Sequence, residues 1–185
     1  MTTHTARIAP PTVETAPEGS RPLFAALKKN LGTVPNLFAT IGHSPEALAS
    51  LLTAMETLGR GRLSAREVEA INLATSELNG CGYCVSAHAA LGRRAGLSPD
   101  DIAAVRTGRG ANAREQALLD LVRRVVRTGG AGAGTELAAA REAGLSDGEV
   151  VEALAHVALK AFTNAVALVA QTEIDFPRAP KLPSL

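Results

Sequence analysis

The chain has 185 residues, with 19 lysines and arginines against 18 aspartates and glutamates, and it is 46% hydrophobic but only 3% aromatic. This length suits one domain with its own core, and a core packed mainly by Ala, Leu and Val favours close-packed helices over sheets. A net charge of +1 gives no general attraction to nucleic acid or to an anionic membrane, so neither is an expected partner.

The two ends differ in composition from the middle. Residues 1–22 contain several prolines and no sustained apolar period, which predicts an extended N-terminal arm. The beginning of this arm lacks the apolar core of a signal peptide, so we expect a cytoplasmic protein. Residues 23–175 are predicted to form a single all-helical domain, and the Pro-rich residues 176–185 a C-terminal tail.

Capping residues mark most of the predicted helices. Ser44-Pro45 combines an N-cap residue with a proline in the first turn, and Ser64 with Glu67 forms a capping box. Gly129 to Gly134 is predicted to be a flexible connector, and no stretch alternates as a half-buried strand does. The predicted helices span 45–58, 64–77 and about 81–94, and others start after Ser98-Pro99, Asn112 and Ser146.

The last predicted helix is apolar nearly all round. The run from Val150 to Ala170 is interrupted by His156, Lys160 and Asn164, which makes it too polar for a bilayer span and predicts a buried helix. These three residues are expected to be hydrogen-bonded core or subunit-contact residues rather than ligands. A helix of this kind needs cover from more than its own domain, so we expect a homo-oligomer. The fold class predicted overall is an all-α bundle of about seven or eight helices.

The chain's only two cysteines, Cys81 and Cys84, lie close together, and His88 follows four residues later on the same helical stripe. A thiol at a helix start is stabilised as thiolate by the backbone dipole. A histidine one turn onward can take the thiol proton, and the neighbouring thiol can attack a sulfenic acid to form a disulfide. The segment thus contains the residues of a complete peroxide-reduction cycle.

Other chemistries fit the same residues less well. A zinc site with Glu as fourth ligand lacks a second Cys or His pair at a suitable spacing. Covalent haem attachment requires a histidine directly after the second cysteine, where Val85 stands, and a thioredoxin-type site requires a strand before the helix. Two inert buried cysteines remain an alternative. No cofactor and no metal are expected.

At this motif the sequence resembles the alkylhydroperoxidase D and carboxymuconolactone decarboxylase family, through the run NGCGYCVSAH and through Glu69 twelve positions before the first cysteine. By that resemblance, Cys84 attacks the peroxide, activated through His88 and Glu69 as a proton relay. Cys81 is then the resolving thiol, reached by a thiol reductant or a dithiol adaptor protein. The alkylhydroperoxidase D proteins have a histidine immediately before the second cysteine, whereas this chain has Tyr83.

Glu77 is a second acidic candidate near the thiols, although we expect it to be a solvated residue at a helix end. The function expected is that of a thiol peroxidase acting through a Cys84 sulfenic acid and a Cys81–Cys84 disulfide. A dithiol redox sensor or disulfide-exchange protein on the same fold stays open, as does a cofactorless decarboxylase. The decarboxylase branch of the family does not rely on a cysteine pair, so Cys81 and Cys84 favour the peroxidase side.

Overall fold

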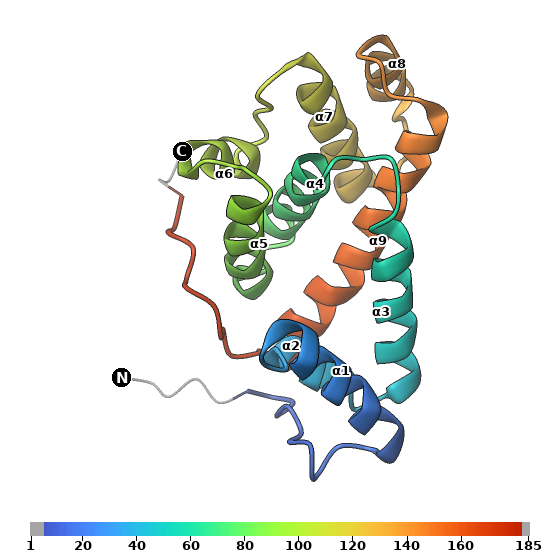
Figure 1. Ribbon diagram of the computed structural model, residues 1–185. Coiled ribbons are helices and arrows are strands. Elements are labelled where there is room, and N and C mark those ends of the chain that lie inside the picture. Colours follow the sequence, from blue (N-terminus) through green and yellow to red (C-terminus); the bar gives the residue numbers. More distant parts are fainter. Residues whose placement is uncertain (1–5, 183–185) are drawn as a thin grey trace.

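The computed structural model describes residues 6–182, so residues 1–5 of the predicted arm and 183–185 of the predicted tail lie outside it. Within that range the chain forms one 3-10 helix, nine α-helices and no strand (Figure 1). The predicted all-α fold is confirmed. The elements are η1 (Glu18–Ser20), α1 (Arg21–Leu31), α2 (Asn36–Ile41), α3 (Pro45–Leu58), α4 (Ala65–Leu78), α5 (Gly82–Arg94), α6 (Pro99–Arg106), α7 (Ala113–Thr128), α8 (Gly134–Glu142) and α9 (Asp147–Ala170).

The N-caps determine where most helices start, as the sequence predicts. The side chain of Ser44 accepts the backbone N–H of Ala47, and that of Asn112 accepts the N–H of Glu115. Capping boxes open α4, α6 and α9, each with a serine and an acidic residue three positions later. Each such cap stabilises its helix by about 1 kcal/mol.

Helices α1, α2 and α8 are not marked by such caps, and the sequence did not predict them. Helix α1 starts at Arg21, inside the predicted arm, because Pro22 occupies a first-turn position where its missing N–H has no intrahelical partner to lose. Helix α8 starts at Gly134, at the end of the predicted connector. The connector begins at Gly129, whose φ of 65° ends α7 in the left-handed conformation.

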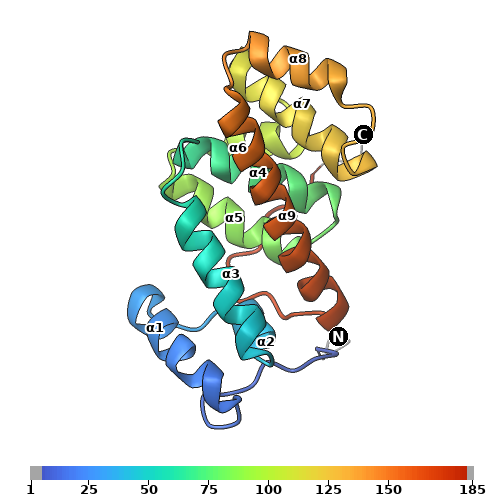
Figure 2. The ribbon, with the colours of Figure 1, turned by 90° about the vertical axis from the view of Figure 1, so that its right-hand side faces the viewer.

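Helix α9 is the central element of the fold. It packs against α4 along much of its length and also contacts α2, α3, α5 and α7 (Figure 2). By length and composition alone it could cross a membrane, but 44% of its most apolar window is buried inside this fold. Its inward face carries polar side chains, among them Lys160 and Asn164, as expected for a core helix rather than for a bilayer span.

The apolar core has two parts. One is an aliphatic cluster between α4, α7 and α9, in which Leu118 and Leu119 are fully buried. The other joins α1, α2 and α3 to the start of α5, and it contains both cysteines and Tyr83. The thiols therefore lie inside a hydrophobic cluster that the N-terminal helices complete.

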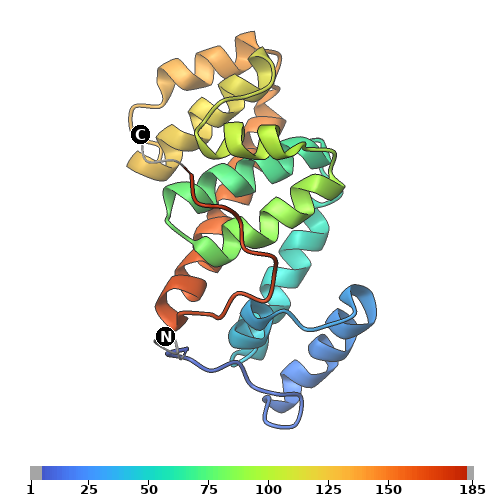
Figure 3. The same cartoon turned by 90° about the vertical axis from the view of Figure 1, so that its left-hand side faces the viewer.

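The C-terminal segment after α9 runs back along α5 towards α6 (Figure 3). It is attached there by two hydrogen bonds: the N–H of Ala179 donates to Ser86 Oγ at 3.1 Å, and Arg106 donates to the carbonyl of Pro180 at 2.8 Å. The described part of the predicted tail thus lies against the helix that begins at the thiols.

Candidate active site

Both thiols lie at the start of α5, where a sharp turn separates it from α4. Gly80 takes a left-handed φ of 68° in this turn, and the polypeptide reverses so that α4 and α5 pack antiparallel. Cys81 is the N-cap of α5, and its Sγ accepts the backbone N–H of Cys84 at 3.3 Å. Both cysteines are free, and their exposed fractions are 0% and 2%.

The pKa values of the two thiols are shifted in opposite directions. The Cys81 thiol donates a hydrogen bond to Cys84, which lowers the pKa of Cys84; the charge of Lys160 and the side chain of Asn164 lower it further, against the effect of burial. The same hydrogen bond and burial raise the pKa of Cys81. Of the two thiols, Cys84 therefore ionises more readily than Cys81.

Glu69 and His88 are in direct contact. Antiparallel packing of α4 on α5 brings Glu69 Oε2 to 2.8 Å from His88 Nδ1, and both side chains are largely buried. With an ionised carboxylate as acceptor, Nδ1 carries the ring proton and donates it. Burial and the charge of Lys160 lower the pKa of His88, so the ring is neutral near pH 7.

Lys160 occupies the other side of the same imidazole. Its Nζ lies 2.5 Å from His88 Nε2, and its side chain is buried. Burial lowers the pKa of Lys160. The sequence predicted that Lys160 would be a hydrogen-bonded core residue, which is correct, but its partner is the candidate catalytic histidine. The only sequence signal for this contact was a lysine on a mostly apolar helix.

Asn164 lies one turn further along α9 and links three elements. Its Nδ2 donates to Ser76 Oγ at 3.3 Å, and its Oδ1 accepts from Asn79 Nδ2 at 2.9 Å. Asn164 is 1% exposed. These bonds hold the turn between α4 and α5 against α9. The same side chain also lowers the pKa of Cys84.

Tyr83, which stands where alkylhydroperoxidase D proteins have a histidine, has a structural role. Its hydroxyl accepts the backbone N–H of Leu37 at 3.2 Å, and its ring meets Phe176 edge to face, with centroids 5.7 Å apart. Burial and the nearby Asp175 carboxylate raise the pKa of Tyr83, so it stays protonated. Asp175 in turn accepts the N–H of Asn36 at 2.7 Å. Tyr83 thus attaches α2 and the C-terminal segment to the thiol turn.

Glu77 is paired with an arginine rather than with a residue of the thiol site. Its carboxylate accepts a hydrogen bond from Arg106 Nε at 2.7 Å, and the Arg106 side chain is only 7% exposed. The expectation of a solvated glutamate is therefore wrong in detail, since an arginine pairs with it. The arginine neutralises its charge on the side of α4 that faces α6.

An open depression of about 530 Å³ borders the resolving thiol. The residues that line it come from the start of α5, the end of α9 and the C-terminal segment, and they include Cys81 but not Cys84. Within residues 6–182, no group of three or more His, Cys, Asp or Glu side chains is placed to hold a metal ion.

This combination, an all-helical fold with a dithiol at a helix start and a buried Glu–His pair behind it, is similar to the alkylhydroperoxidase AhpD core. Residues 45–126 match the model of the Carboxymuconolactone decarboxylase family, which confirms the resemblance drawn from the Cys-x-x-Cys segment. No curated protein sequence matches the chain.

Three solved structures share the fold. The alkylhydroperoxidase AhpD core of a peroxidase-related protein from Ralstonia eutropha JMP134 is 26% identical, with a TM-score of 0.82 over 92% of each chain. A peroxidase-related protein from Silicibacter sp. TM1040 is 22% identical, with a TM-score of 0.80 over 94% of this chain and 95% of that one. The debrominase Bmp8, in complex with 2,3,4-tribromopyrrole, is 19% identical, with a TM-score of 0.76 over 91% of each chain.

Proposed function

We propose that this protein is a cytoplasmic thiol peroxidase that reduces hydrogen peroxide or organic hydroperoxides. The observation that carries the proposal is the pair of free, buried thiols at the start of α5, the helix whose His88 bonds to Glu69. The lowered pKa of Cys84 and the raised pKa of Cys81 support it. The likeness to peroxidase-related structures adds support.

The proposed cycle balances without a cofactor. The Cys84 thiolate attacks the distal oxygen of the hydroperoxide, the O–O bond breaks, and the leaving alkoxide takes a proton to become an alcohol. The Cys84 sulfenic acid then reacts with the Cys81 thiol, which releases water and forms the Cys81–Cys84 disulfide. Two electrons from a thiol reductant, or from a dithiol adaptor protein, restore both thiols.

Glu69 and His88 serve this cycle as a proton relay. The neutral ring of His88 can exchange protons in the buried site, and the Glu69 carboxylate orients it through Nδ1. A carboxylate that fixes the histidine tautomer is the same arrangement that activates nucleophiles in other enzymes.

Burial of the thiols favours this function over disulfide exchange with proteins. Attack by Cys84 on a protein disulfide would need three sulfur atoms in line at a thiol that is 2% exposed, whereas reduction by a protein would take place at Cys81, which borders the open depression. A small peroxide needs only a narrow path. The depression beside Cys81 offers the side from which a reductant can approach the resolving thiol.

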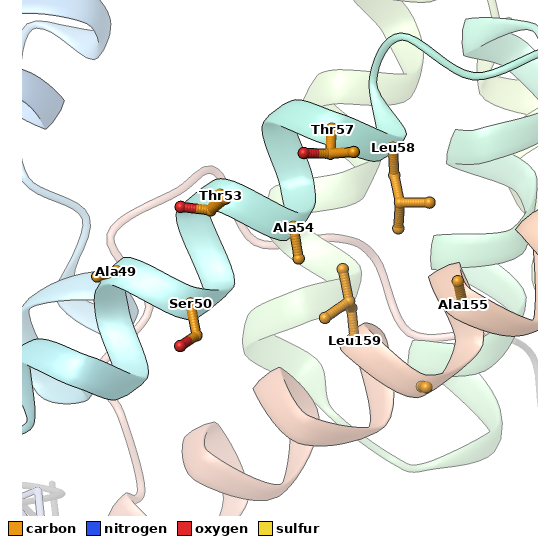
Figure 4. Close-up of a pocket in the computed structure, with 9 residues that line it drawn as sticks. Ala49, Ser50, Thr53, Ala54, Thr57, Leu58, Ala155 and Leu159 are labelled. Atoms are coloured by element: carbon orange, nitrogen blue, oxygen red, sulfur yellow. The ribbon is translucent and has the colours of Figure 1, made fainter.

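We also propose that the protein is a homo-oligomer in which a second copy covers the outer face of α9. That face exposes a run of large apolar side chains, among them Val151, Phe162 and Val169 at 65%, 40% and 62%. Next to it lies an open groove of about 700 Å³ between α3 and α9, lined mostly by small side chains such as Ala54 and Ala155 (Figure 4). Val169→Lys should shift the mass measured by light scattering to that of a smaller species, while Leu31→Lys on α1 should not.

The experiment that tests the peroxidase is a thiol titration before and after one equivalent of tert-butyl hydroperoxide, followed by turnover assays with dithiothreitol. We expect the loss of two thiols per chain, an intramolecular disulfide and sustained turnover. Cys84→Ser should abolish turnover, and Cys81→Ser should stop at a sulfenic acid that a 1,3-dione reagent traps on Cys84. Mainly covalent dimers after oxidation, or full activity of Cys84→Ser, would contradict the proposal.

A further inference from the structure

Lys160 is a buried cation without a carboxylate partner. Its side chain projects from the middle of α9 into the space between α4 and α5, and its Nζ contacts His88 Nε2. None of the ion pairs found among residues 6–182 includes it. An ammonium removed from water without a counter-charge costs several kcal/mol, and such groups gather at functional sites.

The contact determines what His88 can do. Nδ1 donates its proton to Glu69, so Nε2 presents a lone pair, and Lys160 donates an N–H to it. Both ring nitrogens are therefore engaged in the resting protein. Lys160 thus extends the Glu69–His88 pair to a row of three buried groups.

The ionisable groups that surround Lys160 come from three helices. Glu69 faces it from α4, Cys81, Cys84 and His88 face it from α5, and His156 lies one turn before it on α9. Among the neighbouring charges that favour its protonated form, that of Cys84 has the largest effect and that of Glu69 follows. The effect is mutual, because the positive charge of Lys160 lowers the pKa of Cys84.

We propose that Lys160 is a positioning residue for the thiol chemistry, supplying the counter-charge of the Cys84 thiolate and fixing the tautomer of His88. As an ammonium that donates to His88 Nε2, one helical turn from Cys84, Lys160 favours the ionised form of that thiol through its charge. Cys84 lies in a hydrophobic cluster, where screening of this charge by water is weak. The inference rests on the proposed function only in that Cys84 is the nucleophile.

The test measures thiolate formation without any peroxide. In the Cys81→Ser background, the rate of alkylation of Cys84 by iodoacetamide is followed from pH 5 to 10 for Lys160, Lys160→Met and Lys160→Arg. Lys29→Met on the exposed surface of α1 is the control for the loss of one positive charge. Far-UV circular dichroism and thermal melting establish that each variant is folded.

We expect Lys160→Met to move the midpoint of the alkylation profile upward by about one pH unit or more, with about tenfold slower alkylation at pH 7. Lys160→Arg should keep the midpoint nearer that of the parent, because the charge remains, whereas a pure packing role would make the apolar, similarly shaped Met the milder change. An unchanged midpoint in folded Lys160→Met would overturn the proposal.

A second measurement needs no variant and covers the case in which Lys160→Met does not fold. Nitrogen-15 NMR of the imidazole rings in the unmodified protein should show His88 neutral near pH 7, with its proton on Nδ1. A proton on Nε2 would overturn the proposal, since Lys160 could then not donate to that atom. Failure of peroxide turnover with the expected alkylation profile would instead reject the proposed function and leave the role of Lys160 standing.

Discussion

Helix α4 carries two glutamates only two residues apart, Glu67 and Glu69, that point to different regions of the molecule. Glu67 is part of an ion-pair cluster at the start of the helix, where Arg114 bonds both it and Glu149. Glu69 points into the site and meets a neutral histidine instead of an arginine. The ion-pair cluster also includes Arg66 with Asp101 and Glu115, so each of its two guanidinium groups pairs with two carboxylates.

The site is built in the opposite way. Burial and neighbouring charges shift the pKa values of its imidazole, its lysine and its two thiols. Groups that are locked as ions contribute to stability, whereas groups left near their titration points can move a proton. Substitutions in the two regions should therefore separate stability from chemistry.

The largest effect is expected at Glu69. Glu69→Gln keeps the shape and one hydrogen bond to Nδ1, but it removes the charge that holds the tautomer, and peroxidase turnover should fall about 10²–10⁴-fold. The pH–rate profile should lose one limb, while the free energy of unfolding changes little. Glu67→Gln is the matched control, expected to lose about 1 kcal/mol through its cap with turnover preserved. Equal effects of the two substitutions on turnover would show that the relay does not run through Glu69.

In the ion-pair cluster, the sharpest test is Arg66, which donates to both Asp101 and Glu115. Glu115 is 2% exposed, so Arg66→Met leaves a buried carboxylate without its guanidinium. Breaking a buried pair on one side costs about 3 kcal/mol, here offset in part by the N–H of Ala111. Urea denaturation should show this loss of stability, whereas the peroxidase rate of the folded protein should stay within about twofold of the parent. A larger fall in that rate would show that the ion-pair cluster also influences the chemistry at the thiols. Raised activity without destabilisation would contradict the comparison.

As the pH falls, the protein should lose the stability that the ion-pair cluster contributes, whereas the contribution of the apolar core should not depend on pH. Hydrogen bonds from Ser64 and Arg114 lower the pKa of Glu67 against its burial, and bonds from Ser146 and Arg114 lower that of Glu149 to about 2. Groups with a depressed folded pKa bind fewer protons in the native state, so their stabilisation is present above the unfolded value of 4.5 and is lost as pH falls through the folded pKa. The urea midpoint should therefore drop from pH 5 towards pH 2, and less so in Arg114→Met. A midpoint equal at pH 5 and pH 2 would show that the cluster is not stabilising.

The parts of the site that could be predicted are those determined by local sequence. Capping residues and the Asn79–Gly80 stop define α4 and α5 as consecutive helices, and a short turn between helices forces antiparallel packing. The contact between Glu69 and His88 follows from that geometry. Cys81 and Cys84 lie within one turn of the same helix, so their proximity needs no tertiary information.

Lys160 could not be placed in the same way, because 72 residues separate it from His88 and no local signal states which side of α9 faces α5. Its burial is a tertiary fact that emerges only when α9 packs on α4. The N-terminal helices were not predicted for another reason. Prolines usually indicate an extended arm, but here one occupies the first turn of α1 and another, Pro35, is the N-cap residue of α2. Tyr83 then joins α2 to the thiol turn, a contact invisible from sequence.

The smallest effect is expected at Glu77, which lies two turns beyond Glu69 on α4 and near the cysteines in sequence. Its carboxylate accepts a hydrogen bond from Arg106, whose other end donates to the carbonyl of Pro180 in the C-terminal segment. Glu77→Gln retains an acceptor for Arg106 and removes no group that contacts the thiols, His88 or Lys160. Turnover should therefore stay within about twofold of the parent, against the 10²-fold or larger loss expected for a positioned proton-transfer group.

The unfolding free energy of Glu77→Gln should fall by less than about 1 kcal/mol, because the pair is partly exposed and the arginine keeps its second bond. The two glutamates thus differ in their hydrogen-bond partners rather than in their distance along the sequence from Cys81: Glu77 bonds to Arg106, and Glu69 bonds to His88. Turnover of Glu77→Gln and Glu69→Gln is to be measured at several pH values. A comparable loss in both variants would mean that the electrostatic field at the C-terminal end of α4, and not the Glu69–His88 contact, determines the reactivity of the thiol.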